Sequence, residues 1–302
     1  MNFRTFILAL LFLWIHTGCK DLNVENLNDP DFKTVIVTPG KMEELAGDLI
    51  RQWFQITQGH ESLGYGLLAA ADAGTSTTCL TYLFGMEPRK EFNNRLNSSE
   101  CNNSENYYRT LYSILGSSND VLNITEREDF KIQTASIEMV RAVTWFVQGI
   151  TLGYLGLVYD KAFIVTHETD LYCRMESSPY QEIILSAVRS LDQAIAISNN
   201  HSFTLPEDWL PGEPWSSTEF AQLASSFAAR LLVYSARNKS DDNLTDWNRV
   251  YSYAKNGIQK DFAPLAVNKK WKSYYQTYSV MPGWIQTDMY VIHLMDPGMP
   301  AR

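Results

Sequence analysis

Cysteine and histidine are scarce in this sequence, and their spacing excludes the common metal and redox motifs. The 302 residues include four cysteines and five histidines. No two cysteines form a C-x-x-C pair, and Leu171 stands where His167-Glu168 would need a second histidine to bind zinc. A G-x-S-x-G nucleophile turn, a phosphate-binding glycine loop and a calcium loop are also missing from the sequence. The sequence therefore predicts no metal, no cofactor and no catalytic centre.

Positive charge is in short supply as well. The chain has 25 Lys and Arg against 34 Asp and Glu, which gives a net charge of −9 at pH 7. Nucleic acids and anionic lipid headgroups are bound by clustered Lys and Arg. The acidic balance therefore argues against both as partners.

A hydrophobic run long enough to span a bilayer is absent from the start of the chain. Phe6–Ile15 is an apolar run of ten residues, whereas a transmembrane helix needs about 20. The run follows Arg4 and precedes two small residues, an order typical of a secretory signal. Cys19 comes next, so residues 1–18 are predicted to be a bacterial lipoprotein signal, with Cys19 acylated as the lipid anchor. An ordinary secretory signal with an incidental cysteine is the alternative.

Acylation of Cys19 leaves three cysteines, which cannot all pair with one another. An oxidising compartment permits a disulfide between Cys79 and Cys101. The sequence does not establish that disulfide, and free thiols at Cys79, Cys101 and Cys173 are the default expectation.

Beyond a polar tether at residues 19–37, apolar residues recur at three- and four-residue spacing. The fold class is therefore mostly α, with the body of the protein at residues 38–302. Thr38 and Pro39 predict a helix of about 20 residues, Ser178 caps one beginning at Pro179, and Ser217 or Thr218 caps another. Further helices are predicted at 104–125, 131–157 and 247–258.

Long loops interrupt these helices, and the helices themselves form irregular pairs. The pair at 218–260 has the small and aromatic residues of a tetratricopeptide-type unit, and 132–154 with 179–197 forms a second. Corresponding helices start about 65 to 85 residues apart rather than the ~34 of a regular array. The fold is thus expected to be an irregular tetratricopeptide-like superhelix with loop insertions, the longest at 59–104.

Four stretches in order resemble the SusD/RagB family of Bacteroidota surface lipoproteins: CKDLNVENLNDPDF, YYRTLYSILGSSNDVLNI, RAVTWFVQGITLGYLGLVYDKAF, and SPYQEIILSAVRSLDQAIAIS followed by AARLLVYSA and WNRVYSYAKNGI. The resemblance covers most of residues 19–262. Val158-Tyr159-Asp160 replaces the aspartate-proline often found there in the family. Family members commonly continue well beyond position 302, so we expect that the C-terminal part of the domain is missing from this chain.

The resemblance implies capture of a nutrient rather than catalysis. It implies an outer-membrane lipoprotein on the cell surface that binds an oligosaccharide or other nutrient and delivers it to a SusC-like TonB-dependent transporter. Aromatic rings stack on sugar faces while flanking polar groups bind hydroxyls. The candidate ligand-binding residues are drawn from the long loops and the tail: Asp72, Tyr82, Arg89, Phe92, Asn93, Trp209, Trp215 and Trp284.

A protein-binding scaffold and a glycan-degrading enzyme are the two alternative function classes. A secreted tetratricopeptide-type scaffold that binds another protein would have the same helices without glycan binding. A glycan-degrading enzyme would need two carboxylates about 5 to 9.5 Å apart around the sugar, and no pair stands out among the 34 acidic residues. We therefore expect a binding protein rather than an enzyme.

Overall fold

The computed structural model describes residues 39–59, 62–75, 93, 95–126, 134–212, 214–265 and 271–300. The chain divides into a unit of residues 1–41 and a unit of residues 42–302. The first unit is described only at 39–41, so the predicted signal, the anchor Cys19 and the tether lie outside the described residues. The account below concerns the second unit.

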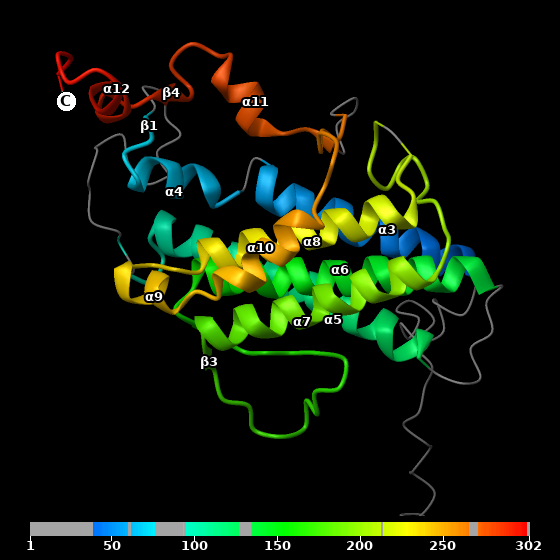
Figure 1. The fold of residues 1–302 in the computed structure, drawn as a ribbon. Helices are drawn as coiled ribbons and strands as arrows, with labels where there is room; N and C mark the ends of the chain where they lie inside the picture. Colours follow the sequence, from blue (N-terminus) through cyan, green and yellow to red (C-terminus); the bar gives the residue numbers. More distant parts are fainter. Residues whose placement is uncertain are drawn as a thin grey trace, which may run out of the picture. The chain divides into compact units, whose positions relative to one another are not determined.

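The described residues are mostly helical, which confirms the predicted fold class (Figure 1). The helices are α3 (Pro39–Gln58), α4 (Gly64–Ala70), α5 (Ser99–Thr125), α6 (Thr134–Val158), α7 (Tyr180–Asn200), α8 (Ser217–Tyr234), α9 (Lys239–Leu244), α10 (Trp247–Lys255), α11 (Tyr274–Ser279) and α12 (Met289–Met295). Four two-residue strands accompany them: β1 (Gly74–Thr75), β2 (Lys161–Ala162), β3 (Ser178–Pro179) and β4 (Gln286–Thr287). None of the described helices is long and apolar enough to cross a membrane.

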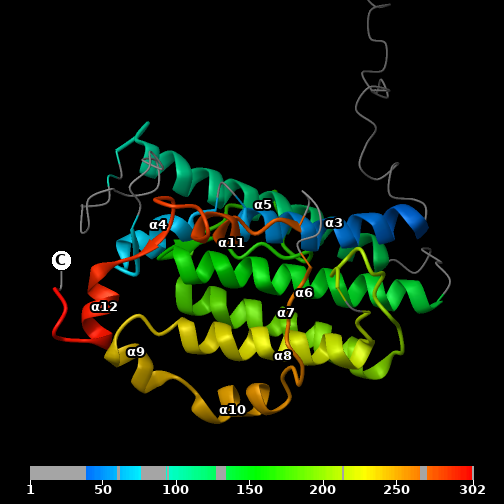
Figure 2. The same cartoon turned by 90° about the horizontal axis from the view of Figure 1, so that it is seen from above.

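Five helices pack side by side in the order α5, α6, α7, α8, α10 (Figure 2). This order confirms the two predicted helix pairs, which are α6 with α7 and α8 with α10. The start of α7 lies beside the end of α6, because the Tyr180 backbone N–H donates to the Asp160 carbonyl at 3.0 Å. Consecutive helices of the first pair therefore run in opposite directions.

Small residues let α6 approach its neighbours closely. A Cβ built on Gly149 would lie 2.8 Å from Leu191 Cγ of α7, and one on Gly153 would lie 2.5 Å from Leu231 Cδ1 of α8. Side chains from the neighbouring helices thus fill the space above each glycine. Close packing of this kind gives interiors a density near that of organic crystals.

A buried polar network joins α5, α6 and α7. Gln148 Nε2 donates to Asn119 Oδ1 at 2.7 Å, and Ser190 Oγ donates to Gln148 Oε1 at 2.6 Å. Asn119 Nδ2 in turn donates to the Val165 carbonyl at 3.1 Å, which ties the loop after β2 to the helices. The Gln148 side chain is fully buried, so each of its amide atoms needs such a partner.

Two predicted helix caps were wrong by one residue. Ser216, not Ser217 or Thr218, caps α8: its hydroxyl accepts from the Glu219 backbone N–H, and the Glu219 carboxylate accepts from the Ser216 N–H. Pro179, without a side-chain hydrogen bond, occupies the cap position of α7. Ser178 cannot cap that helix because it belongs to β3, where it is paired with Ala162 of β2.

The described part of the segment after Pro264 contains two short helices, α11 and α12, and the strand β4. β4 pairs antiparallel with β1, with Gly74 opposite Thr287 and Thr75 opposite Gln286. This ladder connects Gly74 and Thr75, within the predicted 59–104 loop, to the segment after Pro264. Local propensity gave no signal for it, because both strands are only two residues long.

The cysteine expectations are tested in part. Cys101 and Cys173 are free thiols, which agrees with the default expectation for these two residues. Cys79 itself lies outside the described residues.

Candidate functional site: an aromatic pocket

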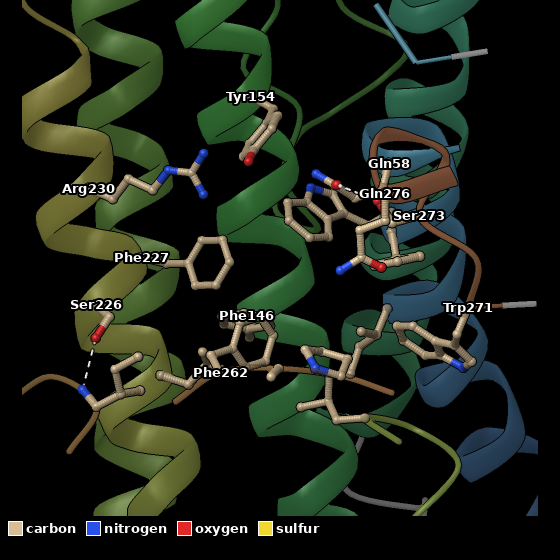
Figure 3. Close-up of a pocket in the computed structure, with 18 residues that line it drawn as sticks. Gln58, Phe146, Tyr154, Ser226, Phe227, Arg230, Phe262, Trp271, Ser273 and Gln276 are labelled. Carbon is tan, nitrogen blue, oxygen red and sulfur yellow. Dashed lines mark hydrogen bonds between the residues drawn. The ribbon is translucent and has the colours of Figure 1, made fainter. Parts of the chain in front are cut away.

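A cavity of about 460 Å³ opens between α3, α6, α8 and the segment that follows α10 (Figure 3). We call it the aromatic pocket. Its volume lies within the usual range for small-molecule sites, about 300 to 1,000 Å³. Seven aromatic residues line it: Trp53, Phe54, Phe146, Tyr154, Phe227, Phe262 and Trp271.

Helical spacing explains how these rings gather. Phe146 and Tyr154 lie eight residues apart on α6, which places them about 80° apart around the helix axis and within one broad face. Phe227 and Arg230 are three apart on α8 and lie on one face. Together these positions aim one side of each helix at the same cavity.

The rings of α3 pack in two directions. The Trp53 ring meets Tyr154 and Phe227 edge-on, at centroid distances of 5.1 and 5.7 Å. The adjacent Phe54 ring lies 4.9 Å from the ring of Trp271. Such contacts contribute beyond simple area burial and fix the ring orientations, so the pocket wall is largely preformed.

The polar groups of the pocket are few and lie among the rings. Arg230 and Tyr154 point toward one another (Figure 3). The Arg230 Cζ atom lies 5.9 Å from the Tyr154 ring centroid and 5.3 Å from that of Tyr234. Burial raises the pKa of the Tyr154 hydroxyl, and Arg230 partly opposes that shift. Tyr154 is therefore a neutral hydroxyl at physiological pH.

Amides and hydroxyls complete the lining on two sides. Ser273 Oγ donates to Gln58 Oε1 at 3.4 Å, and Gln276 lies nearby (Figure 3). On the opposite wall, Ser226 Oγ accepts from the Ile258 backbone N–H at 2.9 Å, which fixes the turn after α10. The described lining residues include no carboxylate, histidine or cysteine.

A second hollow, of about 640 Å³, lies between α7, α8 and α10. Its lining is mostly amide and hydroxyl, and Tyr253 is its one aromatic residue among those described. The Tyr253 hydroxyl already donates to Asp192, which also pairs with Arg249 at 3.3 Å. With its single ring engaged in this way, the hollow is a weaker candidate than the aromatic pocket. The described residues also contain no group of three or more His, Cys, Asp or Glu that could hold a metal ion.

Solved structures show what this arrangement of helices is similar to. A SusD/RagB family protein from Bacteroides thetaiotaomicron superposes with a TM-score of 0.60 and 14% identity, covering 85% of this chain and 52% of the other. A SusD homolog from the same species superposes with a TM-score of 0.54 and 12% identity, covering 77% of this chain and 43% of the other. A SusD superfamily protein from Bacteroides vulgatus superposes with a TM-score of 0.50 and 14% identity, covering 72% of this chain and 42% of the other. The helical body has the SusD fold.

Sequence comparison alone does not reach this result. No protein-family model matches the chain, and no curated protein matches it. The chain spans about half the length of the solved structures, 42% to 52% in the three above. The SusD fold is therefore shown for the helical part, and what such proteins bind must be argued separately.

Within this SusD fold, the structure describes five of the eight predicted site residues. Tyr82, Arg89 and Phe92 lie outside the described residues. Asn93 is exposed, and Asp72 lies in the turn after α4 with a left-handed φ of 51°. None of the described members of the set lines the aromatic pocket.

The ring of each of the three predicted tryptophans packs against neighbouring residues. Trp209 is 4% exposed and lies over Gly47, and Trp215 is 5% exposed and meets Phe262 edge-on at 5.6 Å. Trp284 stacks on Tyr278 at 4.6 Å between centroids. Trp209 and Trp215 therefore pack inside the protein in this conformation, where a ring cannot present a face to a sugar. Ligand binding by the predicted set stays a prediction.

The sequence does not distinguish the residues of the aromatic pocket from core residues. Phe146 and Phe227 belong to the apolar period of their helices, and an apolar period does not distinguish a packed face from one that lines a cavity. Arg230 gave the one local signal, because it is a charge on the same helical face as Phe227.

Proposed function

We propose that the protein is a SusD/RagB-type nutrient-binding lipoprotein of the cell surface. In this role it captures a nutrient, of which a glycan is the class implied by the family resemblance, and delivers it to a SusC-like TonB-dependent outer-membrane transporter. The observation that carries the proposal is the SusD fold over 85% of the chain. The aromatic pocket supports it, since a binding protein needs a preformed concave site.

Lipid attachment at Cys19 is part of the proposal. A single acyl chain gives only marginal membrane binding, whereas two or more signals give a stable anchor. A bacterial lipoprotein cysteine would supply several chains at one point. The tether at 19–37 would then place the helical body above the membrane surface.

The test of the role is purification of the tagged protein from outer membranes with its partners. We expect a TonB-dependent barrel protein to be recovered with it, identified by mass spectrometry. Soluble proteins recovered in place of a barrel would favour the tetratricopeptide-type scaffold. Hydrolysis of any glycan by the purified protein would overturn the expectation of a binding protein.

The anchor is tested separately with labelled palmitate. Wild-type protein should incorporate the label and fractionate with outer membranes, whereas Cys19→Ala should do neither. Cys173→Ala provides the matched control, because Cys173 is an exposed free thiol in the body of the protein. Label that persists in Cys19→Ala would exclude Cys19 as the acylated residue.

A further inference from the structure

The lining of the aromatic pocket is unbalanced in charge. Arg230 contributes a cation, and the described lining residues contain no carboxylate to neutralise it. Arg230 is exposed overall, and its guanidinium lies beside the rings of Tyr154 and Tyr234 and is directed at the Tyr154 side chain (Figure 3). Arginine presents a planar set of N–H donors that matches carboxylate, sulfate and phosphate oxygens in pairs.

Hydrogen-bonding groups other than Arg230 are few in the pocket wall. The Trp53 side chain is 8% exposed, and its Nε1–H has no acceptor among the described residues. Gln58 Oε1 already accepts a hydrogen bond from the Ser273 hydroxyl. A neutral oligosaccharide brings many hydroxyl donors, each of which loses free energy if it is buried without an acceptor. The pocket therefore suits an acceptor-rich group better than a neutral sugar.

The remainder of the pocket wall is apolar and consists mainly of aromatic rings. Phe146 and Phe227 meet edge-on at 5.3 Å between centroids, and Phe262 lies 6.4 Å from Phe227. Arranged in this way, the rings offer edges and faces to a flat apolar body. The volume of about 460 Å³ admits a molecule of two or three fused or linked rings.

We propose that the aromatic pocket binds an organic anion with a planar apolar body, whose acidic group pairs with Arg230. The apolar body lies among the rings of α3, α6 and α8. This ligand class goes beyond the proposed function and does not depend on a transporter or on glycan binding. The inference rests on the charge and hydrogen-bonding groups of the pocket.

Two fluorescent probes that differ in one charged group test the proposal. 1-Anilinonaphthalene-8-sulfonate carries a sulfonate, and N-phenyl-1-naphthylamine is the same ring system without it. Titration of the purified protein with each probe gives the stoichiometry and the ratio of the two Kd values. We expect one saturable site for the sulfonate probe, with a lower Kd than for the neutral probe.

Substitution of Arg230 then locates the site. Arg230→Gln should weaken the sulfonate probe about tenfold, because a charge-assisted pair is lost, and change the neutral probe less than about twofold. Arg230→Lys, which keeps the charge, should retain most of the sulfonate affinity. Arg189→Gln is the matched control, since it removes one exposed positive charge from α7 and should alter neither Kd.

Other outcomes overturn the proposal. Equal losses for both probes in Arg230→Gln would show that the arginine supports packing rather than an anion. Equal effects of Arg189→Gln and Arg230→Gln on the sulfonate probe would place its binding elsewhere. A measurement on wild-type protein is independent of any variant: raising the salt concentration should weaken the sulfonate probe more than the neutral one, and identical salt dependence would contradict an ion pair. A saturable oligosaccharide that displaces both probes would replace the proposed ligand class with a glycan and would leave the proposed function intact.

Discussion

The Arg237 guanidinium donates a hydrogen bond to the backbone carbonyl of Gly156 at 3.0 Å, which ties the segment between α8 and α9 to the end of α6. The same Nη2 atom donates to the Tyr159 carbonyl at 2.9 Å, and Nη1 pairs with Asp160. The last carbonyls of a helix lack intrahelical partners, and they carry the negative end of its dipole. Arg237 satisfies these carbonyls from a residue about 80 positions later in the chain.

Removal of Arg237 is therefore expected to destabilise the protein. Arg237→Ala should lower the free energy of unfolding by about 1–2 kcal/mol, the contribution of hydrogen bonds from a charged donor at a partly exposed site. Arg237→Lys should recover about half, because an ammonium group cannot contact several oxygens in the fixed geometry of a guanidinium. Urea titration measures both differences from the midpoint at constant m-value.

Arg189→Ala is the control for the loss of a surface cation. Arg189 is exposed on α7, and a surface substitution of this kind usually changes stability by less than about 0.5 kcal/mol. Equal midpoints for Arg237→Ala and wild type would show that water replaces the guanidinium at the end of α6 without loss.

The same glycine-to-alanine substitution should have opposite effects in α5 and α6. Gly116 in α5 has no atom within 4 Å of a built Cβ, so Gly116→Ala should stabilise the protein by about 0.5–1 kcal/mol through helix propensity. At Gly149 the added Cβ would lie 2.9 Å from the Ala187 carbonyl oxygen, which the backbone of α7 cannot move away cheaply. Gly149→Ala should cost about 1–3 kcal/mol. Thermal melting gives the change in melting temperature for each variant. An increase in both variants would mean that α6 and α7 separate easily.

Much of the helical body could be predicted from the sequence, because apolar spacing over 18 to 27 residues leaves little ambiguity. Cap residues were harder to predict, since adjacent serines at 216 and 217 offer the same chemistry and only the backbone geometry selects one. The β1–β4 ladder could not be found, because two-residue strands carry no periodic signal. The aromatic pocket was missed for a different reason: Phe146 and Phe227 have the same pattern whether the space beside them is filled or empty.

Glu219 makes the stability depend on pH in the acid range. Hydrogen bonds from the Ser216 backbone N–H, the Lys260 ammonium and the Ser216 hydroxyl lower the pKa of the Glu219 carboxyl from 4.5 to about 2. A carboxyl whose pKa is lower in the folded state stabilises the fold above its unfolded pKa, and loses that effect as the pH falls through the folded pKa. Wild-type stability should therefore fall between about pH 5 and pH 2, and part of that fall should be absent in Glu219→Gln.

The measurement for Glu219 is the urea midpoint of both proteins at several pH values from 7 to 2. Asp246→Asn serves as the comparison, since Asp246 also caps a helix by accepting the Arg249 backbone N–H. If the wild-type and Glu219→Gln curves run parallel, the capping box at Ser216 does not bind the ionised carboxylate more tightly than the protonated form.

The buried Gln148 should prove more costly to replace than any surface residue discussed above. Gln148→Met keeps the length of the side chain but removes the partners of Asn119 Oδ1 and of the Ser190 hydroxyl. Unsatisfied buried groups cost about 1–3 kcal/mol each, so the variant should lose about 2–4 kcal/mol. Ser190→Ala should cost less than that, because Gln148 keeps its bond to Asn119.

A double-mutant cycle separates the network from the packing around it. If Ser190 and Gln148 act as a unit, the double variant should lose less than the sum of the two single losses, with a coupling of about 1 kcal/mol or more. The reason is that Ser190→Ala removes one of the groups that Gln148→Met leaves without a partner. Ser190 Oγ also lies 3.3 Å from the Ser186 carbonyl, its alternative acceptor within α7. Strict additivity would show that the Ser190 hydroxyl bonds to the Ser186 carbonyl at no cost in stability. The Gln148 amide would then contribute only through its hydrogen bond to Asn119 of α5.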